Sequence, residues 1–131
     1  MKIDIRALEL PKDARYVRTL LGDGLNHVYT TKSREEIDRH VREVLSWKEP
    51  HGKVPHGEVY VAEWAGKVVA VCWVGFAPQR SKSHSRPSAV IFALGIRESH
   101  WGDHHLIVRI VDDVREHFLS VNFGSDHHSH N

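Results

Sequence analysis

The stretch from residue 88 to residue 118 constrains the fold most, because it joins two different apolar periodicities through one short polar turn. Residues 88–96 (SAVIFALGI) are almost continuously apolar, which is typical of a strand buried on both faces. After the turn, apolar residues recur at steps of four, three and four, which places them on one side of an α-helix. These residues are Ile107, Val111, Val114 and Phe118. The sequence therefore predicts a buried strand, a tight turn and an amphipathic helix in succession.

This strand–turn–helix unit predicts an anion-binding site at the turn. The first N–H groups of a helix have no partner inside it, and the helix dipole favours negative charge there. Two alternatives stay open for residues 100–105. His100 and His104 are four residues apart and could hold a metal ion, with Asp103 or His105 nearby. Otherwise the turn is a polar helix cap with solvated histidines.

The composition places this unit in an ordinary globular domain. A chain of 131 residues that is 40% apolar and 27% charged is long enough for one core. A net charge of +1 gives no electrostatic case for nucleic acid, and no apolar run approaches the roughly 20 residues that cross a membrane. Cys72 is the single cysteine, and the N-terminus has no signal-peptide core. We therefore expect a cytoplasmic protein.

The rest of the chain supplies a sheet and two more helices. Residues 2–8 alternate as a strand with one solvated side, and Pro11 opens a helix. Ser33 and Glu36 form a capping box at the start of a second helix. Residues 58–76 read as a hairpin that turns at Ala65 and Gly66.

The end of the chain predicts one more strand and a tail. Residues 118–123 (FLSVNF) fit a short strand, and residues 124–131 a mobile His-rich segment. The expected order is β-α-α-β-β-β-α-β, in a single domain over residues 1–123. Its class is α/β (α+β), with a mixed, mostly antiparallel sheet and helices on both faces.

Two segments carry a resemblance to the GNAT superfamily of N-acetyltransferases. The hairpin VYVAEWAGKVVAVCWVGF is similar to two consecutive strands of that family, and the element order agrees. IRESHWGDH at residues 96–104 resembles the family's turn, which often reads Val-x-Pro-x-Tyr-Trp-Gly-Lys-Gly. Ile96, Trp101 and Gly102 match in register. Glu98 replaces the usual proline, Asp103 a basic residue and His104 a glycine.

The resemblance implies a GNAT-like fold and acetyl-CoA as co-substrate, with the pyrophosphate bound by backbone N–H groups of the turn. Acetyl transfer would go to an amine of a small molecule or a protein. A splayed gap between residues 88–96 and the final strand would hold the pantetheine arm. The cofactor-binding residues implied are Leu94, Gly95, Ile96, Trp101, Gly102, Asp103, His104, His105 and Leu106.

No residue is assigned to acid–base catalysis. The family often uses a glutamate near the strand before the turn and a tyrosine further on. Glu63 and Glu98 are the carboxylates nearest the expected site, and Tyr29 and Tyr60 are the available phenols.

Other features admit functional and structural interpretations. The loop with Arg80, Lys82, His84 and Arg86 either reaches a cofactor phosphate or is simply solvated. Trp64 and Trp73 fit packing positions, and Cys72 an inert core thiol.

Two other functions compete with acetyl transfer. A catalytically inactive GNAT-like binding or interaction domain is favoured by the departures at Asp103 and His104 and by the lack of the family's closing elements. A His-based metal-binding protein is the other, through the turn or through residues 126–130. An incomplete sheet also predicts a homodimer, or a partner chain that completes it.

Overall fold

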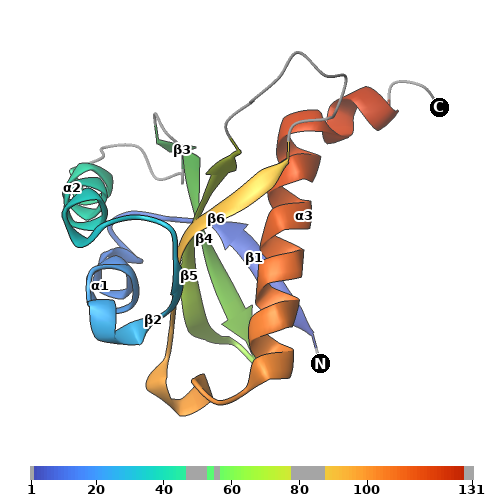
Figure 1. Ribbon diagram of the computed structural model, residues 1–131. Coiled ribbons are helices and arrows are strands. Elements are labelled where there is room, and N and C mark those ends of the chain that lie inside the picture. Colours follow the sequence, from blue (N-terminus) through green and yellow to red (C-terminus); the bar gives the residue numbers. More distant parts are fainter. Residues whose placement is uncertain (1, 47–52, 55–56, 78–87, 129–131) are drawn as a thin grey trace.

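A computed structural model describes residues 2–46, 53–54, 57–77 and 88–128, and these form one sheet between helices (Figure 1). The elements are β1 (Ile3–Ala7), α1 (Ala14–Tyr16), the π-helical η1 (Val17–Leu21), the 3₁₀ turn η2 (Gly24–Asn26), β2 (His27–Thr30), α2 (Arg34–Leu45), β3 (Lys53–Val54), β4 (Gly57–Trp64), β5 (Lys67–Phe76), β6 (Ala89–Ile96), the 3₁₀ turn η3 (Glu98–His100) and α3 (His104–His128).

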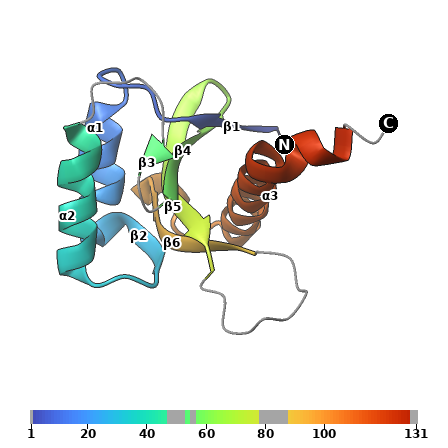
Figure 2. The same cartoon turned by 90° about the horizontal axis from the view of Figure 1, so that it is seen from above.

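The sheet has the order β1-β4-β5-β6-β2, with β3 paired to β4. Every pairing in the described residues is antiparallel, so the mixed sheet that we expected is fully antiparallel there. Helix α3 covers one face, and α1, η1 and α2 cover the other (Figures 1 and 2). The α+β class with helices on both faces is confirmed.

The central hairpin forms where the sequence placed it. Strands β4 and β5 pair from Glu58 opposite Val74 to Trp64 opposite Lys67. Ala65 and Gly66 at the turn both have positive φ, 54° and 78°, as a two-residue hairpin turn requires to match the strand twist. β6 then pairs antiparallel with β5, as expected for the strand at residues 88–96.

The face under α3 is an apolar layer. Its helix contributes four fully or almost fully buried side chains at regular steps of four: Leu106, Ile110, Val114 and Phe118. The predicted stripe began with Ile107 and Val111, but these two residues lie at the border of the observed row and are only partly buried. Both sets fall within the wide apolar sector of such a helix.

The opposite face is covered by shorter segments. Its core joins Val17, Leu20 and Leu21 of η1 to Ile37 and Val44 of α2. The predicted capping box of α2 is present: Ser33 Oγ accepts a 3.2 Å bond from the Glu36 N–H, and the Ser33 N–H donates to Glu36 Oε1 at 3.1 Å. The sequence did not single out His40, which is 4% exposed and stacks on Trp73 with 3.7 Å between ring centroids.

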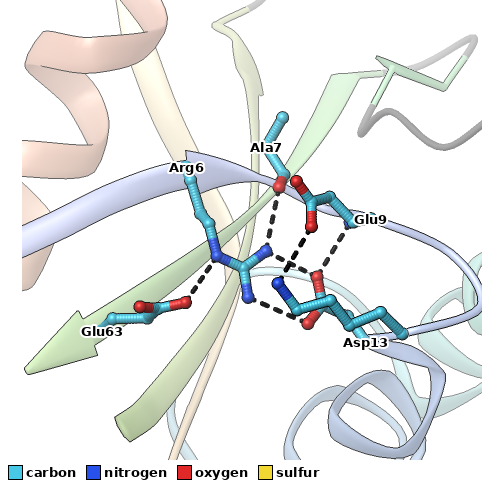
Figure 3. A network of polar contacts seen from close by, with 6 residues as sticks. Arg6, Ala7, Glu9, Asp13 and Glu63 are labelled. Atoms are coloured by element: carbon cyan, nitrogen blue, oxygen red, sulfur yellow. Dashed lines mark hydrogen bonds and ion pairs between the residues drawn. The ribbon is translucent and has the colours of Figure 1, made fainter. Parts of the chain in front are cut away.

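A buried ion pair ties the β1–α1 connection to the sheet (Figure 3). Arg6 on β1 donates to both carboxylate oxygens of Asp13, at 2.7 and 3.0 Å, and its Nε donates to Glu63 on β4 at 2.6 Å. Asp13 is 0% exposed and also accepts a 2.8 Å bond from the Glu9 N–H. Burial alone would raise the pKa of Asp13, but the bonds from Arg6 and Glu9 outweigh it and lower that pKa.

One local prediction was wrong, and two short strands were not predicted. Residues 118–123 are not a strand but continue α3, where Asn122 donates a 2.8 Å bond to the Phe118 carbonyl. Phe118 and Leu119 still pack on the core here, so helix packing overrides the β-propensity that suggested a strand. Residues 27–30 and 53–54, assigned to no strand beforehand, form the short strands β2 and β3.

Helix α3 runs through residues 124–128 of the predicted tail, whose mobility stays a prediction. Residues 129–131 and the basic loop with Arg80, Lys82, His84 and Arg86 lie outside the described residues.

Candidate functional site

The turn between β6 and α3 is held by its own contacts. Arg97 follows the last residue of β6, and its N–H donates to the Val69 carbonyl of β5 at 2.9 Å. Trp101 is 39% exposed, and its indole Nε1 donates to the Ile96 carbonyl at 2.9 Å. The Trp101 ring therefore lies back across the end of the strand and fixes the path of the turn.

Helix α3 is capped by Asp103. Its carboxylate accepts a 3.0 Å bond from the Leu106 N–H, and its carbonyl accepts one of 3.0 Å from the Ile107 N–H. In the described part of the chain, the N–H groups of Gly102, His104 and His105 have no hydrogen-bond partner. The helix end thus keeps free donors beside a carboxylate that already takes one of them.

The other predicted cofactor residues divide into backbone and core positions. Leu94, Ile96 and Leu106 are 0% exposed, so their side chains belong to the core under α3 and only their backbone could face a ligand. His104 and His105 are exposed, and a Cβ at Gly102 would meet nothing within 4 Å. The turn is therefore open at its outer side.

Gly95 has a packing role. A Cβ at this position would lie 1.6 Å from the Leu20 carbonyl oxygen, so no side chain fits there. The absence of a side chain lets η1 cross directly over β6. Gly95 therefore sets the distance between the sheet and the segment that covers it.

The splayed gap that we expected beside β6 is absent from the described structure. Instead, β2 pairs with β6, with His27 opposite Gly95 and Thr30 opposite Ala93. The Thr31 N–H continues this pairing with a 2.9 Å bond to the Phe92 carbonyl. The gap was expected between β6 and a strand at residues 118–123, but those residues belong to α3. Residues 27–30 instead form β2 and occupy the edge of the sheet beside β6.

A cavity of about 330 Å³ lies on the η1 side of the same turn. It is lined by residues from three segments that are remote in sequence: Tyr16, Thr19 and Leu20, then Asn26, then Arg97, Glu98 and Ser99. No short motif links these segments, and sequence reasoning found only Glu98 among them.

The candidate acid–base residues separate clearly in the structure. Glu63 is paired with Arg6, and Tyr60 is buried under α3, where its hydroxyl donates to the Glu58 carboxylate. Burial, followed by this bond to Glu58, raises the Tyr60 pKa. Tyr29 is 47% exposed on β2. Glu98 is the candidate that lines the cavity.

The metal interpretation finds little support in the geometry. Among the described residues, no group of three histidine, cysteine or acidic side chains is placed to hold a metal ion. His100 instead lies beside the Trp64 ring, at 5.4 Å between centroids. Cys72 is buried, and burial raises the pKa of its thiol, as expected for an inert core cysteine.

No helix in the described part of the chain has both the length and the apolar composition that a bilayer-spanning helix needs.

Comparison with known proteins gives one likeness. No family model matches the chain, and no curated protein matches it. Among solved structures, it is similar to aminoglycoside antibiotic 6'-N-acetyltransferase AAC(6')-Ih from Acinetobacter baumannii. The TM-score is 0.43 with 10% sequence identity, over 89% of this chain and 74% of that one.

Proposed function

We propose that this domain binds acetyl-CoA at the turn between β6 and α3 and transfers the acetyl group to an amine. The observation that carries the proposal is the group of free N–H donors of Gly102, His104 and His105 at the exposed start of a 25-residue helix. These donors and the helix dipole suit a pyrophosphate. The resemblance of residues 96–104 to the GNAT turn suggests that this pyrophosphate belongs to acetyl-CoA.

The acceptor amine enters the cavity beside Glu98. The neutral amine nitrogen attacks the thioester carbon, a C–N bond forms, and the C–S bond breaks as CoA thiolate leaves. The proton lost by the nitrogen passes to the Glu98 carboxylate, which is exposed and can return it to solvent or to the thiolate. Alignment of amine and thioester provides much of the acceleration in such a reaction.

A second candidate is a GNAT-like domain that binds a ligand without acetyl transfer. Two observations favour it. The Asp103 carboxylate stands among the free donors and repels a phosphate. The pairing of β2 with β6 also engages backbone groups that an open strand edge would have offered to the thioester.

Calorimetric titration of acetyl-CoA against a matched pair of variants tests the binding. His104→Pro removes one free N–H at the first helical position, where proline is best tolerated, whereas His104→Ala retains it. We expect the alanine variant to bind like the wild type and the proline variant about tenfold more weakly, because a bond to a charged group is lost. Asp103→Asn should bind more tightly, because it removes the negative charge.

Equal affinity of the proline and alanine variants would rule out this turn as the site. No binding to wild type or to Asp103→Asn at millimolar acetyl-CoA would exclude the acetyl-CoA proposal altogether. Release of CoA thiol in the presence of amines then separates the two candidates. Binding without amine-dependent thiol release would favour the domain that performs no chemistry.

A further inference from the structure

We propose that the cavity between η1 and the turn after β6 binds a small zwitterion that carries both an amine and a carboxylate, such as an amino acid. The part of this inference that makes the zwitterion the acetyl acceptor rests on the proposed function; the binding itself does not. The residues that line the cavity include one cation and one anion, Arg97 and Glu98, at adjacent positions of one turn.

The Arg97 guanidinium is fixed at one end and open at the other. Its Nε donates to the Val68 carbonyl of β5, which fixes the plane of the group. Its Cζ lies 5.9 Å from the centre of the Tyr16 ring. Within the described residues the terminal nitrogens of Arg97 have no hydrogen-bond partner and form no ion pair. A guanidinium held at Nε and free at its fork suits a carboxylate, which it can bind through two parallel bonds.

Glu98 supplies the opposite charge. It is exposed, lines the same cavity and forms no ion pair in the described part of the chain. Because the Glu98 carboxylate and the Arg97 guanidinium do not pair with each other, both charges are available to a ligand. An ammonium group at Glu98 and a carboxylate at Arg97 satisfy both, whereas a simple anion or a simple amine satisfies one and meets repulsion from the other.

The remaining walls are joined by local contacts and are partly apolar. Asn26 Nδ2 donates a 2.6 Å bond to the Thr19 carbonyl, which joins η2 to η1. Leu20 is 5% exposed and its backbone rests on Gly95. Tyr16 and Leu20 also line the cavity, so apolar residues stand beside the two charged ones. A cavity of about 330 Å³ lies at the small end of the range for ligand pockets, which fits a single amino acid.

The test compares L-leucine with two analogues, each of which lacks one of its two charged groups. L-Leucine has both groups, L-leucinamide lacks the carboxylate, and N-acetyl-L-leucine lacks the amine. We expect L-leucine to bind to wild type, measured by chemical-shift titration without acetyl-CoA, and each of the other two to bind at least about tenfold more weakly. Equal binding of N-acetyl-L-leucine would reduce the site to a plain anion site and overturn the inference. Equal binding of L-leucinamide would likewise overturn it.

Variants locate the site. Arg97→Gln should weaken L-leucine binding about tenfold or more and leave L-leucinamide binding equal or stronger, because the variant removes the cation that repels its ammonium group. Arg18→Gln is the matched control, because Arg18 is an exposed cation on η1 that does not line the cavity. An equal loss in the control, or no loss in Arg97→Gln, would overturn the assignment. The comparison of probes on wild type stands even if Arg97→Gln fails to fold.

The same preparation separates this inference from the proposed function. Binding of L-leucine without binding of acetyl-CoA would retain the cavity assignment and remove acetyl transfer. Binding of acetyl-CoA with no shift from L-leucine at about 10 mM, a concentration well above ordinary substrate affinities, would overturn the cavity assignment alone.

Discussion

The two faces of the sheet are covered in different ways. On one face, a single long helix buries a continuous apolar row, from Leu106 to Phe118, against the strands. On the other, short segments are fixed by particular contacts. The carbonyl of Leu20 rests on Gly95, the His27 ring donates from Nε2 to the Leu21 carbonyl at 2.6 Å, and Arg6 holds Asp13.

This difference separates two kinds of constraint. Apolar contacts are numerous and non-directional, so the α3 face should lose stability in small steps when one side chain is trimmed. Contacts made by one carboxylate or one missing side chain have no substitute, so the η1 face should respond sharply. The cavity also lies on the η1 face, where irregular segments leave room that a straight helix would fill.

The sharpest response is expected at Asp13. Asp13→Ala leaves the Arg6 guanidinium without its main partner and the Glu9 N–H without an acceptor. Because Asp13 is fully buried while the Arg6 side chain is 23% exposed, we expect a loss of about 3 kcal/mol, at the lower end for a broken buried pair. Denaturant unfolding measures it. Asp112→Ala, at an exposed site on α3, should stay within about 0.5 kcal/mol.

The same ion pair makes the stability of the protein depend on pH in the acid range. The folded-state pKa of Asp13 lies below its unfolded value of about 3.9, so its contribution is complete above that value. It is lost as the pH falls through the lower folded pKa. Asp13→Asn should be less stable than the wild type at neutral pH and lose less stability below about pH 4. Parallel curves for the two proteins would contradict this role.

A somewhat smaller effect is expected where η1 crosses the sheet. Gly95→Ala places a Cβ 1.6 Å from a backbone oxygen, and backbone cannot rotate away as a side chain can. We expect a loss of about 2–3 kcal/mol, with a changed environment for the cavity. Gly102→Ala is the control, since nothing lies within 4 Å of its added carbon. Equal stability of the two glycine variants would contradict the collision, because the entropy effect of Gly→Ala on the unfolded chain is the same at both sites and is stabilising.

The smallest effect is expected under α3. Ile110→Val removes one methylene from a fully buried side chain, and the neighbouring apolar groups can partly close the space. A loss of about 1 kcal/mol follows. Val108→Ala, on the exposed side of the same helix, should change stability by less than about 0.5 kcal/mol. A loss at Ile110 larger than that at Gly95 would reverse the contrast between the faces.

The elements predictable from sequence are those with a long, regular pattern. The hairpin of β4 and β5, the buried strand β6 and the start of α3 follow from alternation, continuous apolarity and helical spacing. The end of α3 was mistaken because FLSVNF has strand-forming residues, although Phe118 extends the same helical row as Val114. There the burial of one helix face overrides local propensity.

The parts that escaped prediction depend on contacts between remote segments. β2 is four residues long and exists because the edge of β6 offers it hydrogen bonds. The cavity needs η1 to rest on Gly95, which brings Tyr16 and Thr19 next to Arg97. Neither arrangement has a periodicity of its own. The local signal for the strand was the run of strand-favouring residues at 28–31, Val-Tyr-Thr-Thr.

The Asp103 cap gives one donor at the start of α3 a tethered partner. The carboxylate belongs to the residue between Gly102 and His104, so its effective concentration at the Leu106 N–H is fixed by the chain and independent of protein concentration. An external anion could use the Leu106 N–H only during the fraction of time that the cap is open, which would reduce the affinity of that contact by the same fraction. The N–H groups of Gly102, His104 and His105 lie outside this equilibrium, so among the described residues the helix start has one donor that is controlled from within the molecule and three that are open.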